Sequence, residues 1–321
     1  TSCTNVLLED LTFQNSPAWC LHLLMSKNIT LRNLNVKNPD YAQNGDGLDL
    51  ESCANVLVEG CTFDVGDDGI CVKSGKDAEG RKRGIPTENV IIRNCVVYKG
   101  HGGFVIGSEM SGGARNIFVS DCSFIGTDKG LRFKTARGRG GVVENVFIKN
   151  IFMKDIVQEA IYFDMYYFTK PPIPGEQLSV PEVTEATPQF RNFEISNVVC
   201  NGAQTGIFMR GLPEMSLKNI SIADAVLKVD KGVQIFETSH LSLTNLKVLT
   251  AQSAPVAYIE NSNHIDISAF SYAENSDILF SLSGERNSHI DVSDTDTSFA
   301  KKLLKVNNGA NEQMLQISDK K

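Results

Sequence analysis

The chain has 321 residues, of which 41% are hydrophobic and 21% charged, so it has enough apolar material for a globular core. Its formal net charge of -7 argues against a general nucleic-acid-binding role, and no apolar run approaches the length of a membrane-spanning helix. Eight cysteines occur without a CxxC pair or a short repeated Cys framework, which argues against a zinc site or a disulfide scaffold.

One repeat organises the chain from its first residues. An Asn or His followed by an apolar residue recurs at intervals that mostly fall between 21 and 29 residues. The repeat begins at Asn5, Asn28, Asn55, Asn89, Asn116, Asn145, Asn192, Asn219, His240, His264 and His289. Because no charged-then-apolar leader precedes the first unit, we expect the natural chain to begin further upstream.

Each repeat predicts three short strands. The positions one, three, six and eight residues after the Asn are apolar, as in Val90, Ile92, Cys95 and Val97. Apolar residues at every second position, one and three residues after the Asn, indicate a strand. The shift from odd to even positions at the sixth residue indicates a bend into a second strand, whose apolar side chains still face inward. A third strand usually opens with Gly, as in "GLDLES" at 47, "GICVKS" at 69 and "GFVIGS" at 103.

These units predict an all-β fold with residues 1–321 forming a single parallel β-helix of about 10–11 coils. A propeller would need longer units with four strands, and the leucine-rich signature with its helix is absent. Cys61, Cys95 and Cys122 share one inward position, so we predict reduced thiols in the core. The Asn residues that begin the units are predicted to form a stacked ladder at a turn.

Two insertions interrupt the spacing, near residues 74–88 and 168–190. The first reads "SGKDAEGRKRGIPTE", and the second is rich in proline, which cannot join a central sheet. Both follow third strands, so we expect them to wall one side of the helix. A tolerated surface loop is an alternative interpretation of the second insertion.

Stacking the coils about 4.8 Å apart brings charged residues together. The position just before the opening Gly holds Asp46 and Asp68 in adjacent coils, and the position before that holds Asp67 and then His101. Further along the third strand, the outward positions of a nearby coil hold Arg132 and Lys134.

This grouping predicts acid–base chemistry. Ionising all of these neighbouring carboxyl groups would cost free energy because their negative charges repel. At least one carboxyl should therefore have a raised pKa while its neighbours stay anionic. Such a split suits a general acid paired with general bases, and His101 could tune the protonation of Asp67. Arg132 and Lys134 could hold a ligand that carries a carboxylate. Turn caps, or a Ca²⁺ site built from carboxylate oxygens, are the alternatives for the acidic residues.

Four motifs in order resemble family 28 of the glycoside hydrolases, the polygalacturonases. They are "NGD" at 44–46, "DD" at 67–68, "GHG" at 100–102 and "RFK" at 132–134. The family's signatures are Asn-Thr-Asp, Asp-Asp, Gly-His-Gly and Arg-Ile-Lys. The similarity covers residues 10–170 and implies that the β-helix is right-handed.

The resemblance also implies roles for single residues. Asp67 resembles the general acid that protonates the leaving oxygen, and Asp46 with Asp68 resembles the base pair that activates water. His101 would maintain the protonation state of the acid. Substrate-binding residues implied in the same way are Asn44, Arg132, Lys134, Tyr167 and Glu109 of "SEMSGG". Trp19 of "NSPAW" matches a family pattern, for which we favour a structural role.

The function that the resemblance implies is inverting hydrolysis of α-1,4-linked galacturonate in pectin, without a metal or cofactor. The insertion near 74–88 and the segment 108–113 are similar to exo-acting bacterial members, so we expect monomers to be released from chain ends. We further expect a monomer that binds a galacturonate-containing polysaccharide, with no nucleic-acid partner and no membrane span. A secreted or periplasmic location follows from the resemblance alone.

Other functions remain open on the same scaffold. An endo-polygalacturonase or a rhamnogalacturonan hydrolase would keep the fold and change the product or the sugar. A pectate lyase would use Ca²⁺ and a basic residue for elimination. A non-catalytic polysaccharide-binding β-helix would tolerate loss of Asp67.

Overall fold

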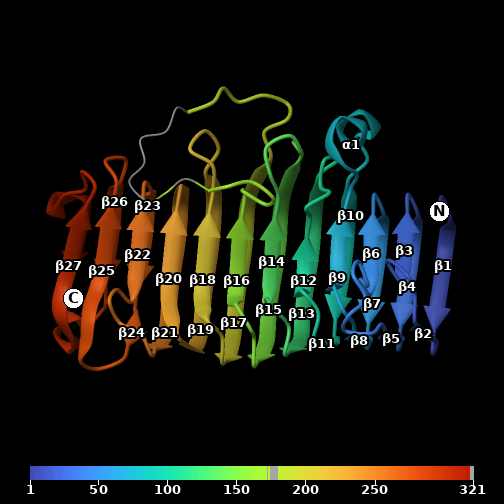
Figure 1. The fold of residues 1–321 in the computed structure, drawn as a ribbon, viewed down its shortest axis with the longest axis horizontal. Helices are drawn as coiled ribbons and strands as arrows, with labels where there is room; N and C mark the ends of the chain where they lie inside the picture. Colours follow the sequence, from blue (N-terminus) through green and yellow to red (C-terminus); the bar gives the residue numbers. More distant parts are fainter. Residues whose placement is uncertain (172, 174–179, 319–321) are drawn as a thin grey trace.

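The computed structural model describes residues 1–171, 173 and 180–318. The chain winds as a right-handed parallel β-helix whose coils follow one another along the long axis, from the N-terminus to the C-terminus (Figure 1). All strand pairs between neighbouring coils in the described part are parallel, as where residues 54–59 pair with 88–93 and residues 68–72 with 102–106. The all-β prediction and the stacked-coil prediction are therefore confirmed.

The first two strands of each coil belong to one sheet, which contains 17 strands among the described residues. In the N-terminal coils they are separate: β1 (Thr4–Glu9), β2 (Thr12–Gln14), β4 (Lys27–Arg32), β5 (Asn35–Lys37), β7 (Ala54–Glu59), β8 (Thr62–Asp64), β10 (Thr87–Arg93) and β11 (Val96–Tyr98). In the middle coils each pair merges into one long bent strand: β13 (Ala114–Ile125), β15 (Val142–Lys154), β17 (Gln189–Asn201), β19 (Leu217–Val229) and β21 (Thr238–Thr250). The last coils contribute β23 (Asn263–Ser268), β24 (Ser271–Tyr272), β26 (Ser288–Ser293) and β28 (Leu315–Ser318).

The third strands form a second sheet, with 11 strands in the described part of the chain. They are β3 (Leu21–Leu24), β6 (Leu48–Glu51), β9 (Asp68–Lys73), β12 (Gly102–Ile106), β14 (Leu131–Lys134), β16 (Glu159–Asp164), β18 (Thr205–Arg210), β20 (Lys231–Phe236), β22 (Ala257–Glu260), β25 (Ser276–Ser283) and β27 (Ala300–Asn307). Two short 3-10 helices, η1 (Thr297–Phe299) and η2 (Glu312–Met314), lie near the end of the chain.

The Asn residues that begin the repeats form the predicted ladder. Each has a positive φ, a conformation that Asn tolerates better than most residues. Its side-chain amide donates to the Asn of the preceding coil, from Asn28 to Asn5 at 3.0 Å through to Asn219 and Asn192 at 3.1 Å. In the later coils His240, His264 and His289 take over the position, and their rings stack with centroids 4.6 and 4.7 Å apart. The ladder keeps successive coils in register.

The core runs the whole length of the helix as stacked rows of apolar side chains. Phe133, of the motif "RFK", is fully buried and packs against Phe163 and Phe193 with ring centroids 4.4 and 5.0 Å apart. The inward cysteines Cys61 and Cys95 are buried and free, as predicted. Burial of a large apolar side chain contributes about 1.5–3 kcal/mol, so these rows are the main source of stability.

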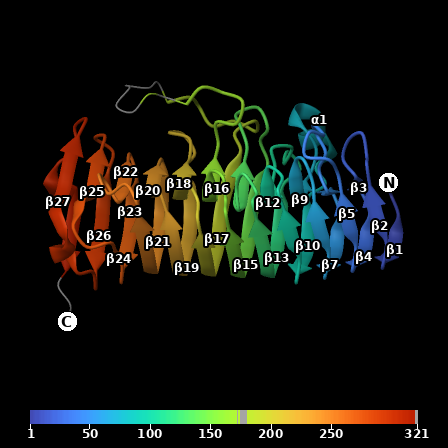
Figure 2. The same cartoon turned by 60° about the horizontal axis from the view of Figure 1, so that its bottom comes forward.

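Both insertions emerge at the end of a third strand, and both lie at the same end of the third-strand sheet (Figures 1 and 2). The first contains a helix that the sequence did not predict, α1 (Asp77–Arg83), which follows β9. The second follows β16, and the part of it at 172 and 174–179 lies outside the described residues. None of the helices in the described part of the chain is long and apolar enough to span a membrane.

Candidate active site

Four neighbouring third strands bring the predicted residues to one face. The pairing of β9 with β12 aligns Asp68 with Gly102, and the pairing of β12 with β14 aligns Val105 with Arg132. The pairing of β6 with β9 aligns Asp49 with Cys71. This is the register predicted from the opening glycines. Because the coils are in register, residues from four distant segments share one small surface.

Asp67 is paired with His101. Oδ1 of Asp67 lies 2.8 Å from Nδ1 of His101 and also accepts the backbone N–H of Asp68 at 2.8 Å. The hydrogen bond to Asp67 raises the pKa of His101, although partial burial opposes the rise. The Asp67 side chain is 18% exposed, compared with 1% for Asp68, so Asp67 is the more accessible of the two to a ligand.

Asp68 is held by two cations. Lys134 Nζ donates to Oδ2 at 2.7 Å, and Arg132 Nη1 donates to Oδ1 at 2.8 Å. Burial alone would raise the pKa of Asp68, but Lys134 and Arg132 outweigh burial and hold it below its ordinary value. Arg132 and Lys134 therefore neutralise a carboxylate of the protein, a partnership that the sequence did not predict.

Asp46 has the opposite electrostatic surroundings. It is 2% exposed, and burial raises its pKa to about 7, with the Asp68 carboxylate adding to the rise. Lys73 opposes the rise from 3.7 Å, the distance between its Nζ and Asp46 Oδ2. The predicted split between a raised pKa and an anionic neighbour is present, and the raised group is Asp46.

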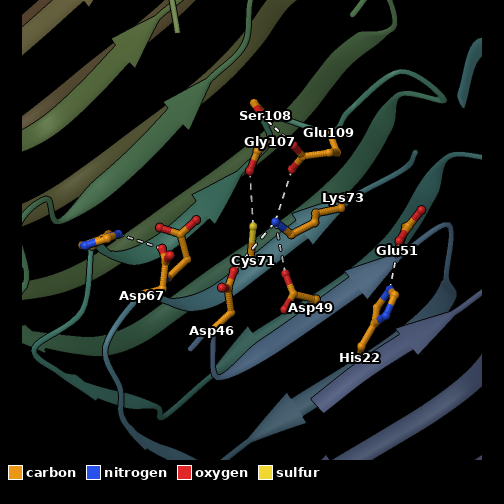
Figure 3. A network of polar contacts seen from close by, with 12 residues as sticks. His22, Asp46, Asp49, Glu51, Asp67, Cys71, Lys73, Gly107, Ser108 and Glu109 are labelled. Carbon is orange, nitrogen blue, oxygen red and sulfur yellow. Dashed lines mark hydrogen bonds and ion pairs between the residues drawn. The ribbon is translucent and has the colours of Figure 1, made fainter. Parts of the chain in front are cut away.

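Lys73 is the charged centre that the sequence analysis missed. Its Nζ also lies 3.3 Å from Asp49 Oδ1 and 3.3 Å from Glu109 Oε2, so three carboxylates surround one ammonium group (Figure 3). Lys73 is only 4% exposed. The signal that could have identified it was its outward position at the end of a third strand, next to an acidic residue in the preceding coil.

Glu109 belongs to this charge cluster. Burial alone would raise its pKa, but Lys73 and a hydrogen bond from the Ser108 hydroxyl, at 3.0 Å, hold it below the ordinary value. Arg139 Nη2 lies 3.5 Å from Glu109 Oε1, the oxygen that also accepts the Ser108 hydrogen bond. The structure therefore places Glu109 at the candidate site with protein cations as its partners.

Two aromatic residues border the site. Tyr167 faces it, with Lys134 Nζ 5.0 Å and the Arg132 guanidinium 5.7 Å from its ring centroid. The adjacent Tyr166 lies instead against Arg137, at 5.1 Å. Trp19 borders the other side, and Lys73 Nζ lies 4.2 Å from the centroid of its ring.

Asn44 is an exposed residue at the edge of the site. It has a φ of 54°, which places the first residue of "NGD" in a tight turn. Gly45 follows, and a Cβ there would lie 2.7 Å from the backbone oxygen of Ala42. The turn therefore requires glycine where the family signature has Thr.

Ion pairs attach the helical insertion to residues of other coils. Arg83 Nη2 lies 2.9 Å from Glu51 Oε1, and Glu51 also contacts His22 at 2.9 Å, as Figure 3 shows for the second pair. Asp77 of α1 pairs with Arg139. These ion pairs link α1 to β6 and to the loop that follows β14.

One metal-compatible group occurs among the described residues. Asp46, Asp68 and Cys71 each place one potential ligand atom within 4.8 Å of the others. The same carboxylates already contact Lys73, Lys134 and Arg132. Protein cations therefore supply positive charge at this position.

Residues 1–187 match the family model for glycosyl hydrolases family 28. The chain is 35% identical over 146 residues to a probable polygalacturonase from Vitis vinifera, an alignment that covers 45% of this chain and 30% of that protein. It is 32% identical over 142 residues to an endo-polygalacturonase from Pectobacterium carotovorum subsp. carotovorum, covering 44% of this chain and 33% of the other. The chain thus spans about a third of the length of these two relatives.

A solved structure resembles the chain over a longer stretch. The crystal structure of a hyperthermoactive exopolygalacturonase from Thermotoga maritima superposes with a TM-score of 0.64 at 35% identity, covering 71% of this chain and 48% of that one. The family model covers more than half of the chain and includes all four motifs of the acidic face. The chain therefore belongs to family 28 of the glycosyl hydrolases.

Proposed function

We propose that the chain hydrolyses α-1,4-galacturonosidic bonds with inversion of configuration. The observation that carries this proposal is the acidic face: Asp67 is bonded to His101, and Asp68 is kept anionic by Arg132 and Lys134. Membership of the family supports a glycosidase, and relatives named polygalacturonases support galacturonan as the substrate.

The proposed mechanism divides the work between the carboxyl groups. Asp67, the more exposed, donates its proton to the glycosidic oxygen as the bond to the anomeric carbon breaks. Asp68, assisted by Asp46 in its ionised form, removes a proton from the water that attacks the opposite side of that carbon. His101 holds Asp67 in the protonation state and orientation that the donation needs.

Substrate binding is proposed for the residues around these carboxyl groups. A galacturonate carboxylate approaching the site would meet the cations Arg132 and Lys134, whose charge Asp68 only partly neutralises. Tyr167 lies over both cations and would contact a sugar ring. Asn44 and Glu109 would donate or accept hydrogen bonds at the rim.

We further propose that the enzyme acts from chain ends, as an exo-hydrolase. The helix α1 is fixed by Arg83–Glu51 and Asp77–Arg139 at one end of the face, where it would stop a polymer from extending further. The similar structure from Thermotoga maritima is that of an exopolygalacturonase, which supports this mode. Release of monomers from pectic chain ends would suit a secreted or periplasmic protein.

The test is product analysis on polygalacturonate in the presence of a chelator. We expect galacturonate monomer as the first product of the wild-type protein, and a loss of at least about 100-fold in rate for Asp67→Asn, because a general acid contributes about 10²–10⁴-fold. Saturated oligomers as first products would contradict exo action but leave the hydrolase proposal intact. Unsaturated products, or full activity of Asp67→Asn, would contradict the hydrolase proposal.

A further inference from the structure

Lys73 is a buried charge for which neither the family motifs nor the proposed mechanism gives a role. It ends β9, five residues after Asp68, and its side chain lies beneath the acidic face (Figure 3). A buried ammonium is retained only where several acceptors compensate its lost hydration. The groups that surround the Lys73 ammonium therefore indicate the role of this residue.

The anionic partners of Lys73 come from the two coils on either side of β9. Asp46 precedes β6, Asp49 lies within β6, and Glu109 follows β12, at 3.7, 3.3 and 3.3 Å from Nζ. Cys71, on β9 itself, is buried and directs its thiol to the Gly107 carbonyl at 3.4 Å. The Trp19 ring covers the ammonium group from the other side.

Among the described residues, Lys73 is the one cation whose nitrogen lies within 4.0 Å of an Asp46 oxygen. Neither Asp49 oxygen accepts a hydrogen bond among the described residues, but Asp49 takes no part in the proposed mechanism. Glu109 has Arg139 and Ser108 as further partners. Asp67, Asp68 and Asp49 are the acidic groups that interact with Asp46 and disfavour its ionisation, whereas Lys73 and Lys134 favour it. Of these two cations, Lys134 donates directly to Asp68.

We propose that Lys73 is a positioning residue whose ammonium group favours the ionised form of Asp46, in which Asp46 can act as a base. The proposal rests on the proposed function, since a base is needed only if the chain is a hydrolase. Asp49 on β6 and Glu109 in the loop after β12 hold the ammonium group beside Asp46. Lys73 acts through Asp46 and does not contact the substrate.

The first test is the pH dependence of kcat/KM on a galacturonate oligomer for wild type, Lys73→Met and Lys73→Arg. The acid limb reports the essential base of the free enzyme. Loss of the cation should move that limb up by about one pH unit or more, which is about a tenfold loss on the acid side. Activity should return toward wild type at alkaline pH, and Lys73→Arg should keep the wild-type limb.

A second readout does not need the substrate. The ¹³C resonance of the Asp46 carboxyl, assigned by its absence in Asp46→Asn, gives the titration midpoint directly. Lys73→Met should raise this midpoint and Lys73→Arg should not. If wild type fails to act on any galacturonate polymer, the proposed function fails, and this titration still decides whether Lys73 controls Asp46.

A purely structural lysine predicts a different result. Lys73→Met would then lower the melting temperature and leave both the acid limb and the carboxyl midpoint unchanged, which would overturn the proposal. If Lys73→Met does not fold, Glu109→Gln replaces it. Removing that competing carboxylate should lower the Asp46 midpoint, and an unchanged midpoint in a folded Glu109→Gln protein would equally overturn the proposal.

Discussion

Asp46 and Asp68 show how their surroundings give two identical side chains different properties. Both are nearly inaccessible, at 2% and 1% exposed. Asp68 receives hydrogen bonds from Arg132 and Lys134, whereas Asp46 has a single cation at 3.7 Å. Burial penalises the charge of both, so the number and closeness of cations determine which pKa rises and which falls.

This difference predicts how stability depends on pH. The pKa of Asp46, raised by burial to about 7, means that the folded state binds this proton more tightly than the unfolded state. Its stabilising contribution is therefore complete below about pH 4 and is lost as the pH rises through 7. Asn at this position cannot ionise, so the Asp46→Asn variant does not lose this contribution. Its unfolding free energy minus that of wild type should therefore increase by up to about 4 kcal/mol from pH 4 to pH 8.

Thermal or denaturant unfolding of the two proteins at several pH values measures this change. Asp155→Asn is a suitable control for the loss of one surface charge, because that side chain is 69% exposed. The difference in unfolding free energy between Asp46→Asn and wild type could instead stay constant from pH 4 to pH 8. That result would show that Asp46 has the same pKa in the folded and unfolded chain.

At the scale of the elements, the Asn ladder determines how the coils stack. Asn116 donates to Asn89 at 3.1 Å and accepts from Asn145 at 3.4 Å, and its φ of 56° is unfavourable for residues with a Cβ. The same register that aligns the ladder aligns the third strands. A fault in the ladder would therefore also displace residues of the acidic face.

Two substitutions separate the contributions of Asn116. Asn116→Ala loses both hydrogen bonds and places Ala at a positive φ, so it should lower the unfolding free energy by about 2–4 kcal/mol. Asn116→Gly loses the same hydrogen bonds without the backbone cost and should be less destabilised than Asn116→Ala by about 1 kcal/mol. Chemical denaturation measures both. Equal losses would mean that the backbone conformation contributes nothing at this position.

The helix α1 illustrates what the sequence could not predict among the elements. The segment "DAEGRKR" has only one nonpolar side chain and contains a glycine, so no periodic pattern marks a helix. A helix of 7 residues is unstable alone. The ion pairs of Arg83 with Glu51 and of Asp77 with Arg139 join it to positions far apart in the sequence, which no local pattern reveals.

At the scale of the whole molecule, the repeat made the architecture predictable. Equal offsets from the opening glycine predicted that Asp46, Asp67, Asp68 and His101 share a face, and the strand register confirms it. The contact of Lys73 with Glu109 was not predictable in this way. Glu109 lies beyond the end of β12, and its approach to Lys73 depends on how the chain turns there rather than on the repeat.

The stacked coils also explain why one face can carry so many charges. Each coil contributes a few outward residues, while its inward side chains form the core row. Outside the acidic face, the third-strand sheet continues with a row of stacked rings, in which Tyr162 and Phe208 lie 5.4 Å apart. The four sequence motifs all lie in the coils of β6, β9, β12 and β14.

The configuration of the first product tests the central claim most directly. Time-resolved proton NMR of polygalacturonate digestion in a chelator distinguishes the anomers before mutarotation mixes them. Inverting hydrolysis of an α-linkage predicts that β-galacturonate appears first, and that Asp67→Asn abolishes its appearance. Initial release of the α-anomer would contradict the roles assigned to Asp46, Asp67 and Asp68, because it would require a covalent intermediate rather than a water placed between acid and base.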